Sequence, residues 1–125
     1  MTRWIVAIAS VCALTVAAGQ HTLAARSYST NYLTFNATMA LPGVTLAPGT
    51  YTFEIANPAG SPRVVAVSSR DGRHRYFMAH TRPVSRPASM DLNKPVTLGE
   101  APAGAPTPIL AWYPIGTRLG FEFVY

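Results

Sequence analysis

The chain has 125 residues, of which 49% are hydrophobic and only 12% are charged. Its formal net charge is +5, and nearly all of its basic residues are arginines. Cys12 is the only cysteine and the five acidic residues are dispersed, which argues against a disulfide framework or a metal centre. A modest positive charge instead favours anionic partners.

Residues 1–25 predict a secretory signal peptide. Arg3 supplies a positive charge, residues 4–18 form an uncharged apolar run, and residues 19–25 turn small and polar. The run has about 15 residues, fewer than the roughly 20 that a membrane-spanning helix needs. We expect a signal helix cleaved within residues 19–26. Residues 26–125 would then form one secreted or periplasmic domain without a transmembrane span.

The first half of this domain alternates between apolar and polar residues, which is typical of half-buried strands. We expect strands at residues 32–38, 44–46 and 50–56, after a polar lead-in at 26–31. Turns at residues 41–43 and 48–49 separate them, because each contains a proline and a glycine. Residues 57–62 hold two prolines and end the third strand.

The second half begins with residues 64–68, a continuous apolar segment that predicts a strand buried on both faces. Asp71-Gly72 predicts a two-residue hairpin turn, with residues 73–80 as the returning strand. Residues 81–88 and 101–108 are rich in proline and predict loops. Further strands are expected at residues 96–99, 109–113 and 119–125.

These segments predict an all-β fold, a single antiparallel β-sandwich or flattened barrel of seven or eight short strands. Parallel pairing is not expected in most places, because the connections are too short for crossovers. The expected core consists of Leu33, Phe35, Tyr51, Phe53, Ile55, Val65, Val67, Leu98, Leu110, Trp112, Phe121 and Phe123.

The sequence assigns no catalytic residue, metal site or cofactor. His74 and His80 share a face of one predicted strand but would lie roughly 20 Å apart, too far for one metal ion. Glu54 and Glu122 are the best candidates for a carboxylate pair, since each takes the polar position of an aromatic-rich strand. Solvated outer-face positions are the simpler explanation of both residues, and the sequence favours it.

Arginines cluster in the middle of the domain, and they are the candidate ligand-binding residues: Arg70, Arg73, Arg75, Arg82 and Arg86, with Arg63 close by. A hairpin tip and the loop that follows it would form one basic patch for phosphate, carboxylate or sulfate groups. An ordinary solvated end of the sheet is the alternative. The expected partner is an anionic envelope polymer or another envelope protein, because export argues against nucleic acid.

Two segments resemble a group of small secreted bacterial proteins of unknown function. They are residues 41–54 (LPGVTLAPGTYTFE) and the C-terminal pieces AWYP at 111–114 and GFEFVY at 120–125. The resemblance implies a small exported β-domain and carries over no catalytic residue.

The sequence therefore predicts an exported, non-enzymatic binding or structural module of the bacterial cell envelope. A periplasmic hydrolase that uses dispersed Glu and His residues is one alternative. A small outer-membrane β-barrel is another, because residues 119–125 alternate and end on an aromatic residue.

Overall fold

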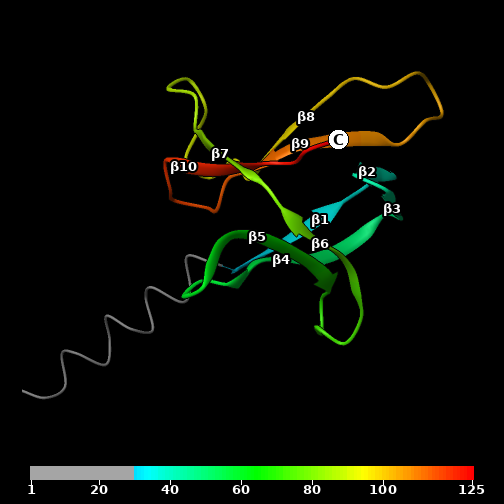
Figure 1. Ribbon diagram of the computed structural model, residues 1–125. Coiled ribbons are helices and arrows are strands. Elements are labelled where there is room, and N and C mark those ends of the chain that lie inside the picture. Colours follow the sequence, from blue (N-terminus) through cyan, green and yellow to red (C-terminus); the bar gives the residue numbers. More distant parts are fainter. Residues whose placement is uncertain (1–29) are drawn as a thin grey trace, which may run out of the picture.

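A computed structural model describes residues 30–125, in which β-strands joined by loops are the only regular elements (Figure 1). The strands are β1 (Thr30–Phe35), β2 (Met39–Leu41), β3 (Val44–Leu46), β4 (Gly49–Asn57), β5 (Ser61–Ser69), β6 (Arg75–His80), β7 (Arg82–Ser85), β8 (Val96–Leu98), β9 (Thr107–Trp112) and β10 (Leu119–Glu122). The expected signal helix lies outside the described residues. From residue 30 onward, no helix has the length and apolar character needed to cross a membrane.

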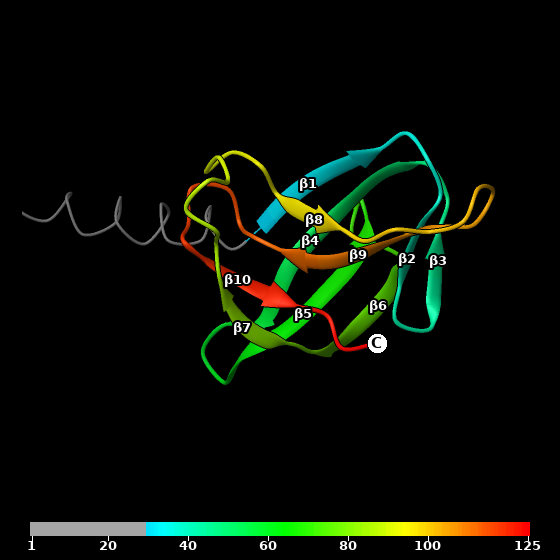
Figure 2. The same ribbon diagram turned by 90° about the horizontal axis from the view of Figure 1, so that it is seen from above.

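The strands form two sheets that lie one above the other (Figure 1). The first sheet has the order β1-β4-β5-β6, and all its pairs are antiparallel. The second has the order β3-β2-β9-β10-β7, with β8 also paired to β9. Seen from above, the strands of the two sheets cross (Figure 2). The all-β prediction is confirmed, and the two sheets do not close into a barrel.

The alternation of the sequence decides which side chains fill the space between the sheets. Leu33 pairs with Tyr51, and Phe53 pairs with Val67, so these residues share the inner face of the first sheet. All four are buried in one hydrophobic cluster that also contains Trp112 and Phe121 of the second sheet and Phe123, which follows β10. Phe35 and Ile55 are partly buried against the cluster.

Two residues of the expected core, Leu98 and Leu110, are instead 49% and 41% exposed. For Leu110 the cause is a β-bulge between β8 and β9. Thr97 pairs with Ala111 but Leu98 pairs with Ile109, which leaves Leu110 as the extra residue. Because this extra residue lies on β9, it reverses the alternation of that strand and turns Leu110 outward. Leu98 pairs with the buried Ile109 but is the last residue of the three-residue strand β8, where it stays half exposed.

Two strands were not expected from the sequence. Arg82–Ser85 was predicted to be a loop, but it is β7 and pairs with β10. Pro83 is tolerated there because β7 is an edge strand, which needs to donate hydrogen bonds on one side only. Met39–Leu41 is β2, which pairs in parallel with β9. This pair comes from residues far apart in the sequence, so no short crossover is required.

A buried hydrogen bond links the two sheets at Trp112. The indole Nε1–H of Trp112 donates to Asn31 Oδ1 over 3.1 Å, and the backbone N–H of Ile115 donates to the same oxygen over 3.1 Å. Asn31 was expected in a polar lead-in, but it is a buried residue of β1. One side-chain oxygen therefore satisfies two donors from the opposite sheet and the turn that follows it.

We predict that Asn31→Ala lowers the free energy of unfolding by about 1–3 kcal/mol, because both donors lose their acceptor. Urea unfolding of Asn31→Ala, Trp112→Phe and the double variant measures this loss. Trp112→Phe removes one donor, so the double variant should lose less than the sum of the two single variants. Strictly additive losses of stability would contradict an energetic coupling between Asn31 and Trp112.

Candidate functional site

The turn between β5 and β6 presents three of the candidate arginines. β5 ends at Ser69 and β6 begins at Arg75, so a five-residue loop joins them. The two-residue hairpin predicted at Asp71-Gly72 is therefore wrong. The backbone N–H of Ser69 donates to His74 O over 2.7 Å, which closes the wider loop.

The Asp71 side chain explains why the loop is wider than predicted. Asp71 Oδ1 accepts hydrogen bonds from Ser69 Oγ at 2.6 Å and from the backbone N–H of Arg73 at 3.0 Å. Such local bonds from an aspartate to its own loop replace those of a tight turn. The Ser69 hydroxyl, and then the Arg73 N–H, hold the pKa of Asp71 below its ordinary value. Asp71 is therefore an anion that its own loop already binds.

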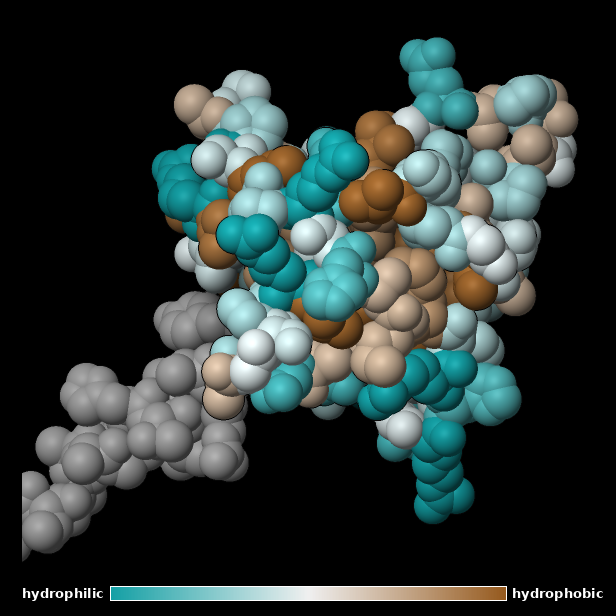
Figure 3. Space-filling model, viewed as in Figure 1, coloured by the Kyte–Doolittle hydropathy of each residue, from teal (hydrophilic) through white to brown (hydrophobic). Residues whose placement is uncertain are grey.

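Arg70, Arg73 and Arg75 are all exposed at this end of the first sheet. In Figure 3, hydrophilic side chains project from the molecule where Figure 1 shows the β5–β6 loop. Three arginines and one carboxylate, that of Asp71, fall within six residues of the sequence. We call these three arginines the hairpin arginines.

Arg82 does not join the hairpin arginines. It begins β7, directly after β6, whereas Arg75 begins β6 at its other end. Seven residues of extended chain place the two positions about 20 Å apart. Arg82 instead lies opposite Glu122 of β10. The hairpin tip and the following loop, which were expected to form one patch, are thus at opposite ends of β6.

Arg86 has a different role, because it is only 4% exposed. Its guanidinium and Nε–H donate to five backbone carbonyl groups, those of Asp91, Lys94, Tyr113, Pro114 and Thr117, at 2.6–3.4 Å. It also lies over the Tyr113 ring, 5.1 Å from the centroid. Arg86 therefore binds the protein's own backbone rather than presenting its charge to solvent. No local pattern in the sequence distinguishes it from the exposed arginines.

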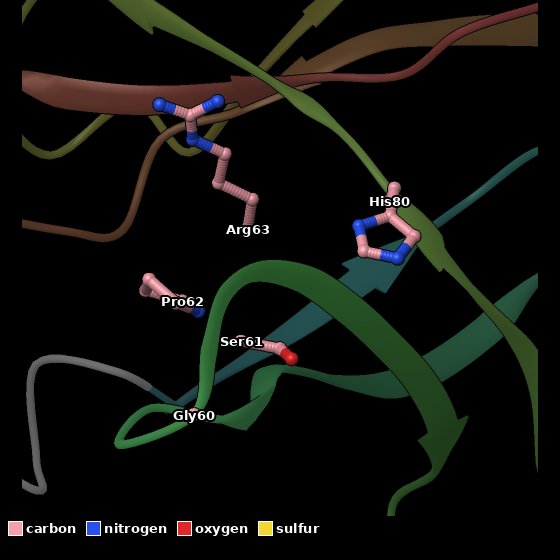
Figure 4. A pocket seen from close by; sticks show the side chains of 5 residues that line it. All are labelled: Gly60, Ser61, Pro62, Arg63 and His80. Carbon is pink, nitrogen blue, oxygen red and sulfur yellow. The ribbon is translucent and has the colours of Figure 1, made fainter.

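A shallow pocket of about 220 Å³ lies at the far end of β5 and β6 (Figure 4). Its lining residues are Gly60, Ser61, Pro62, Arg63 and His80. In Figure 4 the Arg63 side chain extends away from His80, so the two side chains do not converge. The lining contains one imidazole and no carboxylate, and thus lacks the acid–base pair that hydrolysis ordinarily uses.

The remaining acidic and histidine candidates are not brought together. Glu54 lies on β4 of the first sheet and Glu122 on β10 of the second. Their neighbours Phe53 and Phe121 are buried, so each glutamate faces away from the core on its own sheet. His74 is in the β5–β6 loop, whereas His80 ends β6. Within residues 30–125 there is no group of three metal-ligating side chains.

Comparisons with protein-family models, with curated proteins and with solved structures found no match for this chain.

We predict that Arg86→Lys lowers the free energy of unfolding by about 3 kcal/mol, because one ammonium group cannot satisfy five carbonyl groups around a planar fork. Urea unfolding measures the loss. Arg82→Lys is the matched control at an exposed position, and it should change stability by less than about 0.5 kcal/mol. Equal effects of the two substitutions would contradict the structural role of Arg86.

We predict that Ser69→Ala raises the pKa of Asp71 toward its ordinary value, because the hydroxyl bond to the carboxylate is the largest cause of the shift. A lowered pKa in the folded state stabilises the loop above the unfolded-state pKa, and this contribution is lost as the pH falls through the folded-state pKa. Titration of the Asp71 side-chain carbonyl resonance by ¹³C NMR measures the folded-state pKa in the unchanged chain and in the Ser69→Ala variant. Ser85→Ala, a control substitution on β7, should leave the pKa of Asp71 unchanged.

Proposed function

We propose that this chain is an exported, non-enzymatic binding module of the bacterial cell envelope that contacts anionic polymers through the hairpin arginines. The observation that carries the proposal is the exposure of Arg70, Arg73 and Arg75 within one loop and strand start. Guanidinium groups pair readily with carboxylate, phosphate and sulfate groups. The export pattern of residues 1–25 supports a place in the periplasm or outside the cell.

The electrostatics of the loop favour an external anion. Asp71 is the only acidic residue between Arg63 and Arg86, and its carboxylate already accepts bonds from Ser69 and from the backbone of Arg73. Three positive charges against one internally bonded negative charge leave a net positive end. Such an end attracts polyanions, and the attraction weakens as salt screens it.

Binding is favoured over hydrolysis by the placement of the carboxylates. Glycoside hydrolysis generally requires two carboxyl groups within about 10 Å of each other across the scissile bond. Glu54 and Glu122 belong to different sheets and face away from the core between them. The proposal accordingly assigns no catalytic residue and no cofactor.

The test is binding of polygalacturonate and of polyphosphate to the processed chain, measured by calorimetry at low ionic strength. The Arg70→Ser, Arg73→Ser, Arg75→Ser triple variant should bind both polymers roughly tenfold or more weakly and show a smaller salt dependence, because fewer counterions are released. The control triple variant changes Arg63, Arg82 and Arg118 to Ser, which removes the same charge elsewhere. If both triple variants lose affinity equally, net charge alone explains binding and the proposal is wrong.

A further inference from the structure

The outer face of the first sheet carries a row of four side chains that ends at Arg75, one of the hairpin arginines. The strand register aligns Tyr32 with Thr52, Thr52 with Ser68, and Ser68 with Arg75, across β1, β4, β5 and β6. Tyr32 is 61% exposed, whereas Thr52 and Ser68 are 7% and 4% exposed although they face away from the core. A longer side chain must therefore cover the middle of the row.

The Arg70 side chain reaches across this face to Tyr32. Its guanidinium carbon lies 5.9 Å from the centre of the Tyr32 ring. Arg70 follows β5 and Tyr32 belongs to β1, so the arginine side chain has to cross β4, on which Thr52 lies. The Thr52 hydroxyl is within 3.3 Å of Arg70 O, which holds the start of the loop against this face. Arg70 thus places its charge over the sheet rather than at the tip of the hairpin.

Arg75 also lies along the sheet. Its Nη1 is 3.5 Å from Met78 Sδ, on the same strand. Beyond Tyr32 and Thr52, the next cross-strand pair is Thr34 and Thr50, whose exposed hydroxyl groups are 2.8 Å apart. The outer face therefore offers an exposed aromatic ring, a guanidinium beside it, a second guanidinium, and a pair of hydroxyl groups.

We infer that this outer face binds an acidic polysaccharide, a polymer of sugars with about one carboxylate per ring. The inference rests on the proposed function and names its ligand class. A sugar acid matches the three kinds of group: its C–H face packs on the Tyr32 ring, its carboxylate pairs with Arg70, and its hydroxyl groups bond to Thr34 and Thr50.

The mixture of groups on the face favours this ligand over nucleic acid or polyphosphate. Glu54 lies on the same outer face, two residues along β4 from Thr52, so two arginines are accompanied by one glutamate. Nucleic acids carry a charge every few ångströms along the strand, and tight binding to them requires a continuous track of cations. A pair of cations beside an aromatic ring and a pair of hydroxyl groups suits a polymer whose carboxylates are carried on sugar rings with C–H faces and hydroxyl groups of their own.

The experiment compares Tyr32→Ala and Tyr32→Phe with the unchanged chain, using polygalacturonate, polyphosphate and an oligothymidylate as probes. Tyr32→Ala should weaken polygalacturonate binding about fivefold, because the sugar loses the ring on which it packs. The affinity of the Tyr32→Ala variant for polyphosphate should change less than twofold. Tyr32→Phe keeps the ring and should bind polygalacturonate as the unchanged chain does. Circular dichroism confirms that each variant is folded.

The outcomes separate this inference from the proposed function. If the hairpin arginines are required for both polymers but Tyr32→Ala weakens neither, the binding proposal stands and the polysaccharide assignment is overturned. Tighter binding of oligothymidylate than of polygalacturonate also overturns that assignment. If the triple arginine variant binds both polymers as well as the unchanged chain does, both proposals fail.

Discussion

The packing of Trp112 between the two sheets is the contact on which the rest of the structure depends. Its ring stacks on Phe121 with a centroid distance of 5.5 Å and contacts Phe53 of the opposite sheet at 5.9 Å. Its N–H bonds to Asn31. The described residues contain no cysteine, so apolar burial and these aromatic contacts must hold the sheets together. The hydrogen bond to Asn31 fixes the orientation of the Trp112 ring, since an indole N–H left unpaired in the core would be costly.

Two arginines show how the same side chain can stabilise a fold or present a charge. Arg86 is surrounded by carbonyl oxygens from the segment after β7 and from the turn after β9, and it thereby joins two irregular segments to each other. The Tyr113 ring beneath it also packs on Gly120, where a side chain would overlap the ring. Arg70 has no such enclosure. It lies on the outer face beside Tyr32, where a ligand can reach it.

The β5–β6 loop connects the fold to the proposed function. Asp71 and Ser69 bond to each other and widen the turn, and a bulge in β6 makes Arg75 rather than Tyr76 the partner of Ser68. Together they place Arg70 over β4 and Arg75 along β6. The shape of this loop therefore gives the outer face of the sheet its positive charge.

The sequence by itself determined most of the strands and most of the core, because alternation reports directly which side of a strand is buried. It correctly placed Leu33, Tyr51 and Phe53 inward, and it located the basic segment. It failed at Leu110 and at the Asp71-Gly72 turn, where a bulge and a side-chain bond changed the local count of residues. Only the tertiary structure decided which arginines are enclosed by the protein and which are exposed. Whether a guanidinium is enclosed, like Arg86, or exposed, like Arg70, depends on carbonyl groups and rings that distant parts of the chain supply.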